Sequence, residues 1–230
     1  MRPDGLLAAA KALRYWEDRQ QVLAHNLANA DTPGFKAERV FARLIEGEGV
    51  VARTATDQSQ GTLTPTGRPL DLAIDGPGFF VVDTPDGDRL TRGGAMHVDD
   101  VGRLVTAAGH PLLGEHGPIV VPPGAVEIDA SGTVSVDGRE VARLRMEAVP
   151  ADVSLVRESG GLYRPDALRM PLDASQRRVR QGHLEESNVS PIESLVDMIT
   201  VQRSFAAVQN SVRVMDDVMG TIANDLGRVV

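Results

Sequence analysis

Apolar residues recur along the first part of the chain in alternating steps of three and four. Only one position of this stripe is polar, and its members are Leu6, Ala9, Leu13, Trp16, Gln20, Leu23, Leu27 and Ala30. Such spacing keeps one stripe in line along a helix and is typical of a coiled-coil seam. The pattern predicts a helix over residues 5–30, which Pro33 and Gly34 end.

The last part of the chain predicts a longer helix, over residues 191–227. Ser190 suits the N-cap, Pro191 suits the first helical position, and Glu193 completes a capping box. Every position of its stripe is apolar: Met198, Val201, Phe205, Val208, Val212, Met215, Met219, Ile222 and Leu226. Such a helix spans ~50 Å at about 1.5 Å per residue, which exceeds the diameter of a compact domain of this size. We therefore expect this stripe to need a partner.

Periodicity alone leaves two partners open for these stripes. In one arrangement the two helices form an antiparallel pair within the chain, as a stalk capped by the middle region. In the other they meet copies of the same protein or of a related one. A buried Gln20 would help to fix the register of either seam, at some cost in stability.

The middle of the chain, about residues 50–184, lacks a helical period and holds short β-prone runs separated by Gly- and Asp-containing turns. These runs are 70–74, 79–83, 119–121, 126–128, 133–136 and 143–149. Frequent short strands with such turns indicate antiparallel β structure. The polar segments 47–69 and 150–183 are expected to be loop or extended connection.

Together these patterns predict an α+β fold. The N- and C-terminal helices pair as a coiled-coil-like bundle, and a central, mostly antiparallel β domain lies between them in the sequence. The expected segments are 1–46 with the first helix, an extended connector over 47–69, the β domain over 70–183, and the C-terminal helix over 184–230.

Composition and charge restrict the partners and the chemistry expected of this protein. The 230 residues carry a net charge of −8, and no basic run is longer than the pair Arg177-Arg178, so nucleic acid is an unfavourable partner. The absence of cysteine excludes disulfides, thiol catalysis and Cys-ligated zinc. No apolar stretch reaches the length of about 18 residues that suggests membrane insertion. The N-terminus, with Lys11, Arg14 and Glu17 close behind its apolar patch, is a poor cleavable signal peptide.

The sequence contains few patterns that indicate a metal-binding, cofactor-binding or catalytic site. The five histidines do not converge at ligand spacing, and His110 and His116 lie six apart with Pro111 between them, so no metal is expected. Phosphate-loop, dinucleotide and nucleophile-elbow motifs are absent from the sequence. We therefore expect no catalytic residues and no cofactor.

Three blocks of sequence carry a resemblance to a known family. Residues 26–36 (NLANADTPGFK) resemble the N-terminal signature of bacterial flagellar rod and hook proteins. Residues 70–80 (LDLAIDGPGFF) and 90–94 (LTRGG) resemble the start of the β domain in that branch. Residues 181–189 (QGHLEESNV) and 198–203 (MITVQR) resemble the C-terminal signature. Three such blocks in this order are highly specific.

The resemblance implies a structural subunit of the flagellar basal body, not an enzyme. Members of the family leave the cell through the flagellar type III export apparatus without a cleaved signal. They assemble with copies of themselves and neighbouring rod subunits into a helical tube, whose inner wall is built from paired terminal helices. The rod lies in the cell envelope, transmits torque from motor to hook and encloses the export channel. Neither nucleic acid nor membrane insertion is implied.

The resemblance also assigns roles to residues. The two apolar stripes would form the assembly interface. Asn26, Asn29 and Thr32 would bond backbone at the helix end, and Pro33, Gly34 and Phe35 would fix and anchor the following turn. Core positions of the β domain would include Leu72, Ile74, Phe79 and Phe80.

The resemblance indicates the type of rod subunit less directly than it indicates the family. A chain of this length with one β region is similar to a proximal or a distal rod subunit, and the sequence at 191–195 favours the proximal type. The first helix departs from the Gln- and Ala-rich pattern of relatives at Tyr15-Trp16 and at 17–19. A cell-wall hydrolase and a non-polymerising adaptor with a helical stalk are the rival functions.

We also expect both ends of the free monomer to be largely disordered. Ordering a residue costs about 1–2 kcal/mol of backbone entropy, and a lone amphipathic helix recovers little of it in water. Burial of the stripes on assembly would then order the ends.

Overall fold

The computed structural model describes residues 4–45, 49–150, 153, 155–165 and 169–226. The chain divides into two compact units that interleave in sequence. The helical unit contains the residues up to 28, residues 38–55 and the residues from 190 onward, and the β unit contains residues 29–37 and 56–189. The chain therefore passes between the units four times. The segment bounds expected from the sequence stay a prediction.

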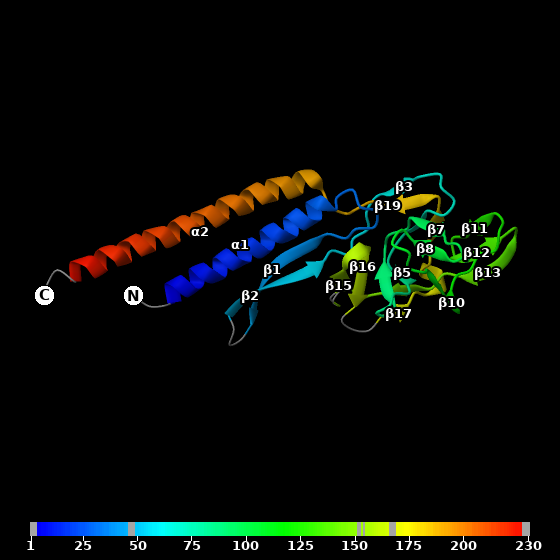
Figure 1. Ribbon diagram of the computed structural model, residues 1–230, viewed down its shortest axis with the longest axis horizontal. Helices are drawn as coiled ribbons and strands as arrows, with labels where there is room; N and C mark the ends of the chain where they lie inside the picture. Colours follow the sequence, from blue (N-terminus) through cyan, green and yellow to red (C-terminus); the bar gives the residue numbers. More distant parts are fainter. Residues whose placement is uncertain (1–3, 46–48, 151–152, 154, 166–168, 227–230) are drawn as a thin grey trace. The chain divides into compact units, whose positions relative to one another are not determined.

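The helical unit consists of two antiparallel helices and a two-stranded ribbon (Figure 1). Helix α1 (Asp4–Ala28) lies alongside α2 (Pro191–Leu226), and strands β1 (Glu38–Ile45) and β2 (Gly49–Thr56) form the ribbon. Helix α1 contacts both α2 and β1 and lies between α2 and the ribbon (Figure 1). Arg19 of α1 reaches Asp197 of α2, with 3.9 Å between Nη2 and Oδ2.

The stripes predicted from periodicity include the sides on which the helices are covered. Val201 is 1 % exposed. The half-buried stripe residues are Ala9, Leu13, Trp16, Gln20, Leu23, Leu27 and Ala30 in the first stripe and Met198, Phe205, Val208, Val212 and Met215 in the second. Met219 is 41 % exposed, and the side chains of Leu6, Ile222 and Leu226 lie outside the description. Helices α1 and α2 pack on each other within one chain. The disorder expected of the free monomer stays a prediction.

Helix α2 is longer than α1, with 36 residues against 25. Because the helices are antiparallel and pair Arg19 with Asp197, the C-terminal part of α2 continues past the start of α1 (Figure 1). Val214 and Val218, in that part, are 61 % and 50 % exposed. The intramolecular pair therefore leaves apolar surface on α2 uncovered.

The β unit is built from short antiparallel strands. Its largest sheet has the order β15-β16-β6-β5-β14-β17, with β15 (Leu155–Glu158), β16 (Leu162–Pro165), β6 (Arg89–Thr91), β5 (Phe79–Val82), β14 (Met146–Ala148) and β17 (Met170–Pro171). A three-stranded sheet contains β11 (Val126–Ile128), β12 (Thr133–Val136) and β13 (Arg139–Arg143).

The remaining strands of the described chain form pairs. These are β3 (Leu63–Pro65) with β19 (His183–Glu185), β4 (Leu72–Ile74) with β18 (Val179–Gln181), β7 (Met96–Val98) with β8 (Leu104–Thr106), and β9 (Leu113–Gly114) with β10 (Gly117–Pro118). Two 3₁₀ turns occupy Ser159–Gly161 and Ala174–Gln176.

Strand β5 is covered on both faces. Phe80 and Val82 belong to the larger apolar cluster, and Phe79 and Val81 belong to a second cluster around Tyr163. Because side chains alternate along a strand, this explains the unbroken apolar run FFVV. The four expected core side chains, Leu72, Ile74, Phe79 and Phe80, are each at most 2 % exposed.

Some expected elements are wrong. Residues 119–121 form no strand, and Val120 makes only a single bridge to Arg103. The segment 47–69, expected as an extended connector, contains β2 and β3. The described part of the segment 150–183, expected as loop or extended connection, contains β15, β16, β17 and β18. These short polar strands are stabilised by pairing with distant segments, such as β3 with β19, and local composition carries no sign of such partners.

A prediction follows from the tight contact at Gly94. A methyl group there would overlap the carbonyl oxygen of Leu72, whose own N–H donates to the carbonyl of Gly94 at 2.9 Å. Gly94→Ala should therefore destabilise the β unit by about 2–4 kcal/mol. Gly220→Ala, in open space on α2, should stabilise the helix by about 1 kcal/mol. Hydrogen exchange of the full chain, read by mass spectrometry, reports each unit separately, and equal protection in both variants would contradict the argument.

Candidate functional site: a buried ion cluster between the signature segments

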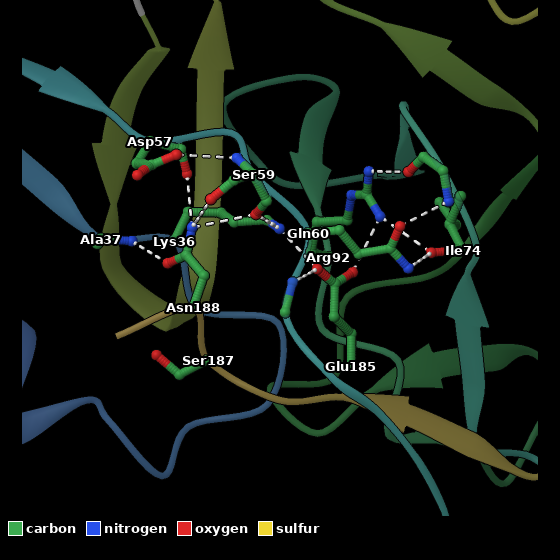
Figure 2. A network of polar contacts seen from close by, with 12 residues as sticks. Lys36, Ala37, Asp57, Ser59, Gln60, Ile74, Arg92, Glu185, Ser187 and Asn188 are labelled. Carbon is green, nitrogen blue, oxygen red and sulfur yellow. Dashed lines mark hydrogen bonds and ion pairs between the residues drawn. The ribbon is translucent and has the colours of Figure 1, made fainter. Parts of the chain in front are cut away.

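The chain leaving α1 and the chain entering α2 lie side by side within the β unit. The N–H of Gly34 donates to the carbonyl of Glu185 at 2.7 Å, and the N–H of Asn188 donates to the carbonyl of Phe35 at 3.3 Å. Residues of the N-terminal and C-terminal signatures, more than 140 positions apart in the chain, thus form one junction (Figure 2).

Glu185, at the end of β19, is the centre of this junction (Figure 2). Its Oε1 accepts hydrogen bonds from Lys36 Nζ at 2.6 Å and from the N–H of Gly61 at 2.9 Å. Its Oε2 accepts from Arg92 Nη1 at 2.9 Å. The side chains of Lys36, Glu185 and Arg92 are at most 2 % exposed. We call these three residues the Glu185 cluster.

The two cations make further bonds to backbone carbonyls. Lys36 Nζ donates to the carbonyl of Ser59 at 2.5 Å. Arg92 donates from Nη1 to Ile74 at 3.1 Å and from Nη2 to Gly76 at 2.6 Å. Arg92 Nε is buried and has no hydrogen-bond partner in the structure. Each cation therefore fastens one more segment of the β unit to Glu185.

Of the three residues in the Glu185 cluster, Glu185 is the one whose loss should destabilise the protein most, because its carboxylate faces both cations. Two cations face one carboxylate, and water is excluded from all three side chains. Burial lowers the pKa of Lys36, and the charge and hydrogen bond of Glu185 oppose that lowering. Burial lowers the pKa of Arg92 as well, again against the effect of Glu185.

Asn188 completes the junction with hydrogen bonds to two other segments. Its Oδ1 accepts from the N–H of Ala37 at 2.7 Å. Its Nδ2 donates to the carbonyl of Asp57 at 2.9 Å and to that of Ser59 at 3.1 Å. A single amide thus joins the segments on either side of the ribbon to the segment that precedes α2 (Figure 2).

The signature turn differs in part from its expected bonding. Asn26 is buried and bonds backbone, but the partner is Glu38 rather than the helix end: Oδ1 accepts from its N–H at 3.0 Å, and Nδ2 donates to its carbonyl at 2.8 Å. The Thr32 hydroxyl donates to Asn29 Oδ1 at 3.3 Å, so these two side chains bond each other. Asn26 therefore fixes the start of β1 beside the end of α1.

Pro33, Gly34 and Phe35 make the turn into the β unit. Gly34 has a φ of +71°, and a Cβ there would overlap the backbone of Arg92. Phe35 is 2 % exposed, and the guanidinium carbon of Arg157 lies 3.7 Å from its ring centroid. The turn is thus held by a close backbone approach and a buried, cation-covered ring.

The sequence blocks that carry the family resemblance contain four residues of this junction, but the sequence predicted no role for them. These are Lys36, Arg92, Glu185 and Asn188. One signal was present, because Lys36 is one of only two lysines in the chain and directly follows the predicted turn. Among the described residues no group of three or more His, Cys, Asp or Glu is placed to hold a metal ion. No helix in the described part of the chain combines the length and apolarity needed to cross a membrane.

Comparison with known proteins gives this arrangement a family. Three family models match consecutive parts of the chain: the flagella basal body rod protein model at residues 6–36, the flagellar hook protein FlgE/F/G D1 domain at 73–136, and the flagellar basal body rod FlgEFG protein C-terminal model at 180–226. The first and third contain the two signature segments that meet at the Glu185 cluster.

Full-length relatives agree. The flagellar basal-body rod protein FlgF of Escherichia coli is 39 % identical over 91 % of this chain and 92 % of its own length. The FlgF protein of Caulobacter vibrioides is 32 % identical over 90 % of this chain and 91 % of its own. The rod protein FlgG of Bacillus subtilis is 28 % identical over 95 % of this chain and 97 % of its own. The chain belongs to the family of flagellar basal-body rod proteins.

The charge balance of the Glu185 cluster predicts an asymmetry between two variants. Glu185→Gln leaves two buried cations facing a neutral amide and should lower the free energy of unfolding by about 3–5 kcal/mol. Lys36→Met leaves the Arg92–Glu185 pair intact and should cost less. Urea denaturation of the two variants measures both losses of unfolding free energy. A greater loss in Lys36→Met than in Glu185→Gln would contradict this prediction.

The lowered pKa of Lys36 predicts a pH dependence. The unfolded chain keeps this proton up to a pKa near 10.5, whereas the folded chain loses it at a lower pH. The unfolded state therefore binds more protons in that window, so the contribution of Lys36 to stability rises with pH up to 10.5. The stability of wild type relative to Lys36→Met should increase as the pH rises towards 10.5. Urea denaturation at several pH values measures this, and a decrease would refute it.

Proposed function

We propose that this chain is a proximal-rod subunit, which polymerises through its terminal helices into the shaft that transmits torque and encloses the export channel. As a member of the rod family it is a structural subunit of the flagellar basal body. The observation that carries the proximal assignment is its similarity to FlgF proteins, which are 39 % and 32 % identical in Escherichia coli and Caulobacter vibrioides. FlgG relatives at 28 % and 31 % identity support the distal rod as the second candidate.

Exposed apolar surface on α2 supports polymerisation. Ile192, Leu195, Val196 and Ile199 are 77 %, 49 %, 58 % and 51 % exposed, and they lie on the side of α2 opposite Val201. Apolar patches of this kind mark interaction surfaces in soluble proteins. The pairing of α1 with α2 would be a coiled-coil-like seam, and this second face would meet neighbouring subunits.

The Glu185 cluster supports a mechanical role. It ties the segment that leaves α1 and the segment that enters α2 to the same buried carboxylate. A load carried by either terminal helix would enter the β unit through this junction rather than through a flexible linker. A subunit that resists twist needs such short, buried connections.

Export places a further requirement on the chain. We propose that it leaves the cell through the flagellar export apparatus without a cleaved signal, and that its partners are copies of itself and neighbouring rod subunits. Neither catalysis nor a cofactor has a part in this function. The adaptor with a helical stalk remains the rival, because the α1–α2 pair also satisfies much of the apolar stripe within one chain.

The two faces of α2 predict different outcomes for aspartate substitutions. Ile199→Asp lies on the exposed face and should leave the monomer within about 0.5 kcal/mol of wild-type stability, but abolish rod assembly and motility. Val201→Asp buries an unpaired charge at the seam and should separate the helices. Val208→Asp should abolish assembly while sparing the β unit.

Circular dichroism of each monomer and purification of basal bodies from cells that carry only the variant measure these effects. A motile Ile199→Asp strain with normal rods would favour the adaptor function over the polymerising rod subunit. Limited proteolysis of the dilute wild-type chain is the companion test. Protease resistance of both ends would show that the helices pair before assembly.

A further inference from the structure

The helical unit has two unlike outer faces. Helix α1 lies between α2 and the ribbon β1–β2, so one outer face belongs to the ribbon and the other to α2 (Figure 1). Both faces occur at the same level of the unit, because the ribbon lies beside the Asp18–His25 part of α1 and the first turns of α2 pair with Arg19.

The ribbon presents a basic, aromatic face. Glu38 and Thr54 line the groove against α1, so alternation along each strand turns Arg39 and Arg53 to the opposite side. Arg39, Arg53 and Ala55 are exposed, and Phe41, which shares their face, is 44 % exposed. A two-stranded ribbon is marginal in water by itself, and an exposed Phe that shares a face with two arginines is typical of a binding surface.

The start of α2 presents the complementary surface. The aliphatic patch of Ile192, Leu195, Val196 and Ile199 is flanked on one side by Glu193 and Asp197, which are both exposed. An aliphatic patch with a carboxylate edge matches an aromatic patch with an arginine edge in both hydrophobicity and charge. The charged residues described as exposed on the ribbon face, Arg39 and Arg53, are both positive, in a chain of net charge −8.

We propose that the ribbon face of one subunit binds the first two turns of α2 on a second copy of this chain. The contact is heterologous, because it joins two different faces that lie on opposite sides of the same helical unit. Repetition of such a contact adds subunits side by side without closing a dimer, and this generates a ring or an open helix. The inference rests on the proposed polymerisation and assigns it a particular pair of surfaces.

Cysteine cross-linking tests the contact directly, since the chain has no cysteine of its own. The variant Ala55→Cys with Val196→Cys changes one small exposed residue on each face and keeps Phe41 and both arginines. Because α1, about 10 Å thick, lies between the two faces, an intrachain disulfide exceeds the reach of about 7 Å between Cα atoms. Any disulfide between the two positions must therefore join different chains.

The experiment uses cells whose own copy is replaced by the double variant, treated with a thiol oxidant and analysed on non-reducing gels. The expected result is a ladder of three or more chains in the basal-body fraction. Each single-cysteine variant can give dimers at most. The pair Ala55→Cys with Val214→Cys is the matched control, because Val214 is also exposed on α2 but lies about 27 Å along the helix from Val196. A ladder with Val214→Cys instead of Val196→Cys would overturn the assignment.

Charge exchange provides a second readout that needs no cross-link. Arg53→Glu and Glu193→Arg should each reduce the cross-linked fraction by about tenfold, and the two together should restore it. The proposal would be overturned if the double charge variant lost as much of the cross-linked fraction as the single variants. If wild-type chain is present in basal bodies but Ala55→Cys with Val196→Cys gives no ladder, this contact is wrong and the rod function stands. If wild-type chain is absent from basal bodies, the rod function itself fails.

Discussion

The buried carboxylate of Glu185 is the interaction on which the rest of the molecule depends. Three ionised side chains lose their water at one point, and the cost is offset only because each has short bonds to a partner or a carbonyl. Hydrophobic side chains of similar volume would have served stability equally well. A charged cluster instead demands one geometry, because the hydrogen bonds of both cations to the Glu185 carboxylate fix where their side chains lie. The junction of the two signature segments thus has a defined rather than an adaptable structure.

This constraint explains why distant parts of the sequence carry the family signatures. Lys36 and Glu185 are separated by 149 positions, and they pair with each other at a junction where Glu185 also pairs with Arg92. The turn at Gly34 and the amide of Asn188 place the backbone so that these side chains meet. The two signature segments therefore meet in a single structural feature of the β unit.

Much of the fold could be predicted from the sequence, for identifiable reasons. Helix α1 and helix α2 follow from an unbroken 3.5-residue period with a Pro-Gly stop and a Ser-Pro start, and their ends agree within two residues. Strands β5 and β12 follow from β-branched and aromatic runs between turns. The ribbon and β3 could not be predicted, because their pairing depends on residues far away in the chain. The Glu185 cluster was missed for the same reason: a lysine, an arginine and a glutamate in separate segments carry no local pattern that joins them.

The helical unit shows why a folded subunit of this kind still has reason to assemble. Intramolecular pairing covers one stripe of α2 but leaves a second aliphatic face at its first turns and further apolar side chains toward its end. An apolar side chain that moves from water into a contact contributes about 1.5–3 kcal/mol, so a patch of four such residues outweighs many surface ion pairs. Polar edges then decide which partner and which register are accepted. Under the proposed assembly, stability within the subunit and affinity between subunits would reside on different sides of the same helix, so that substitutions could change one without the other.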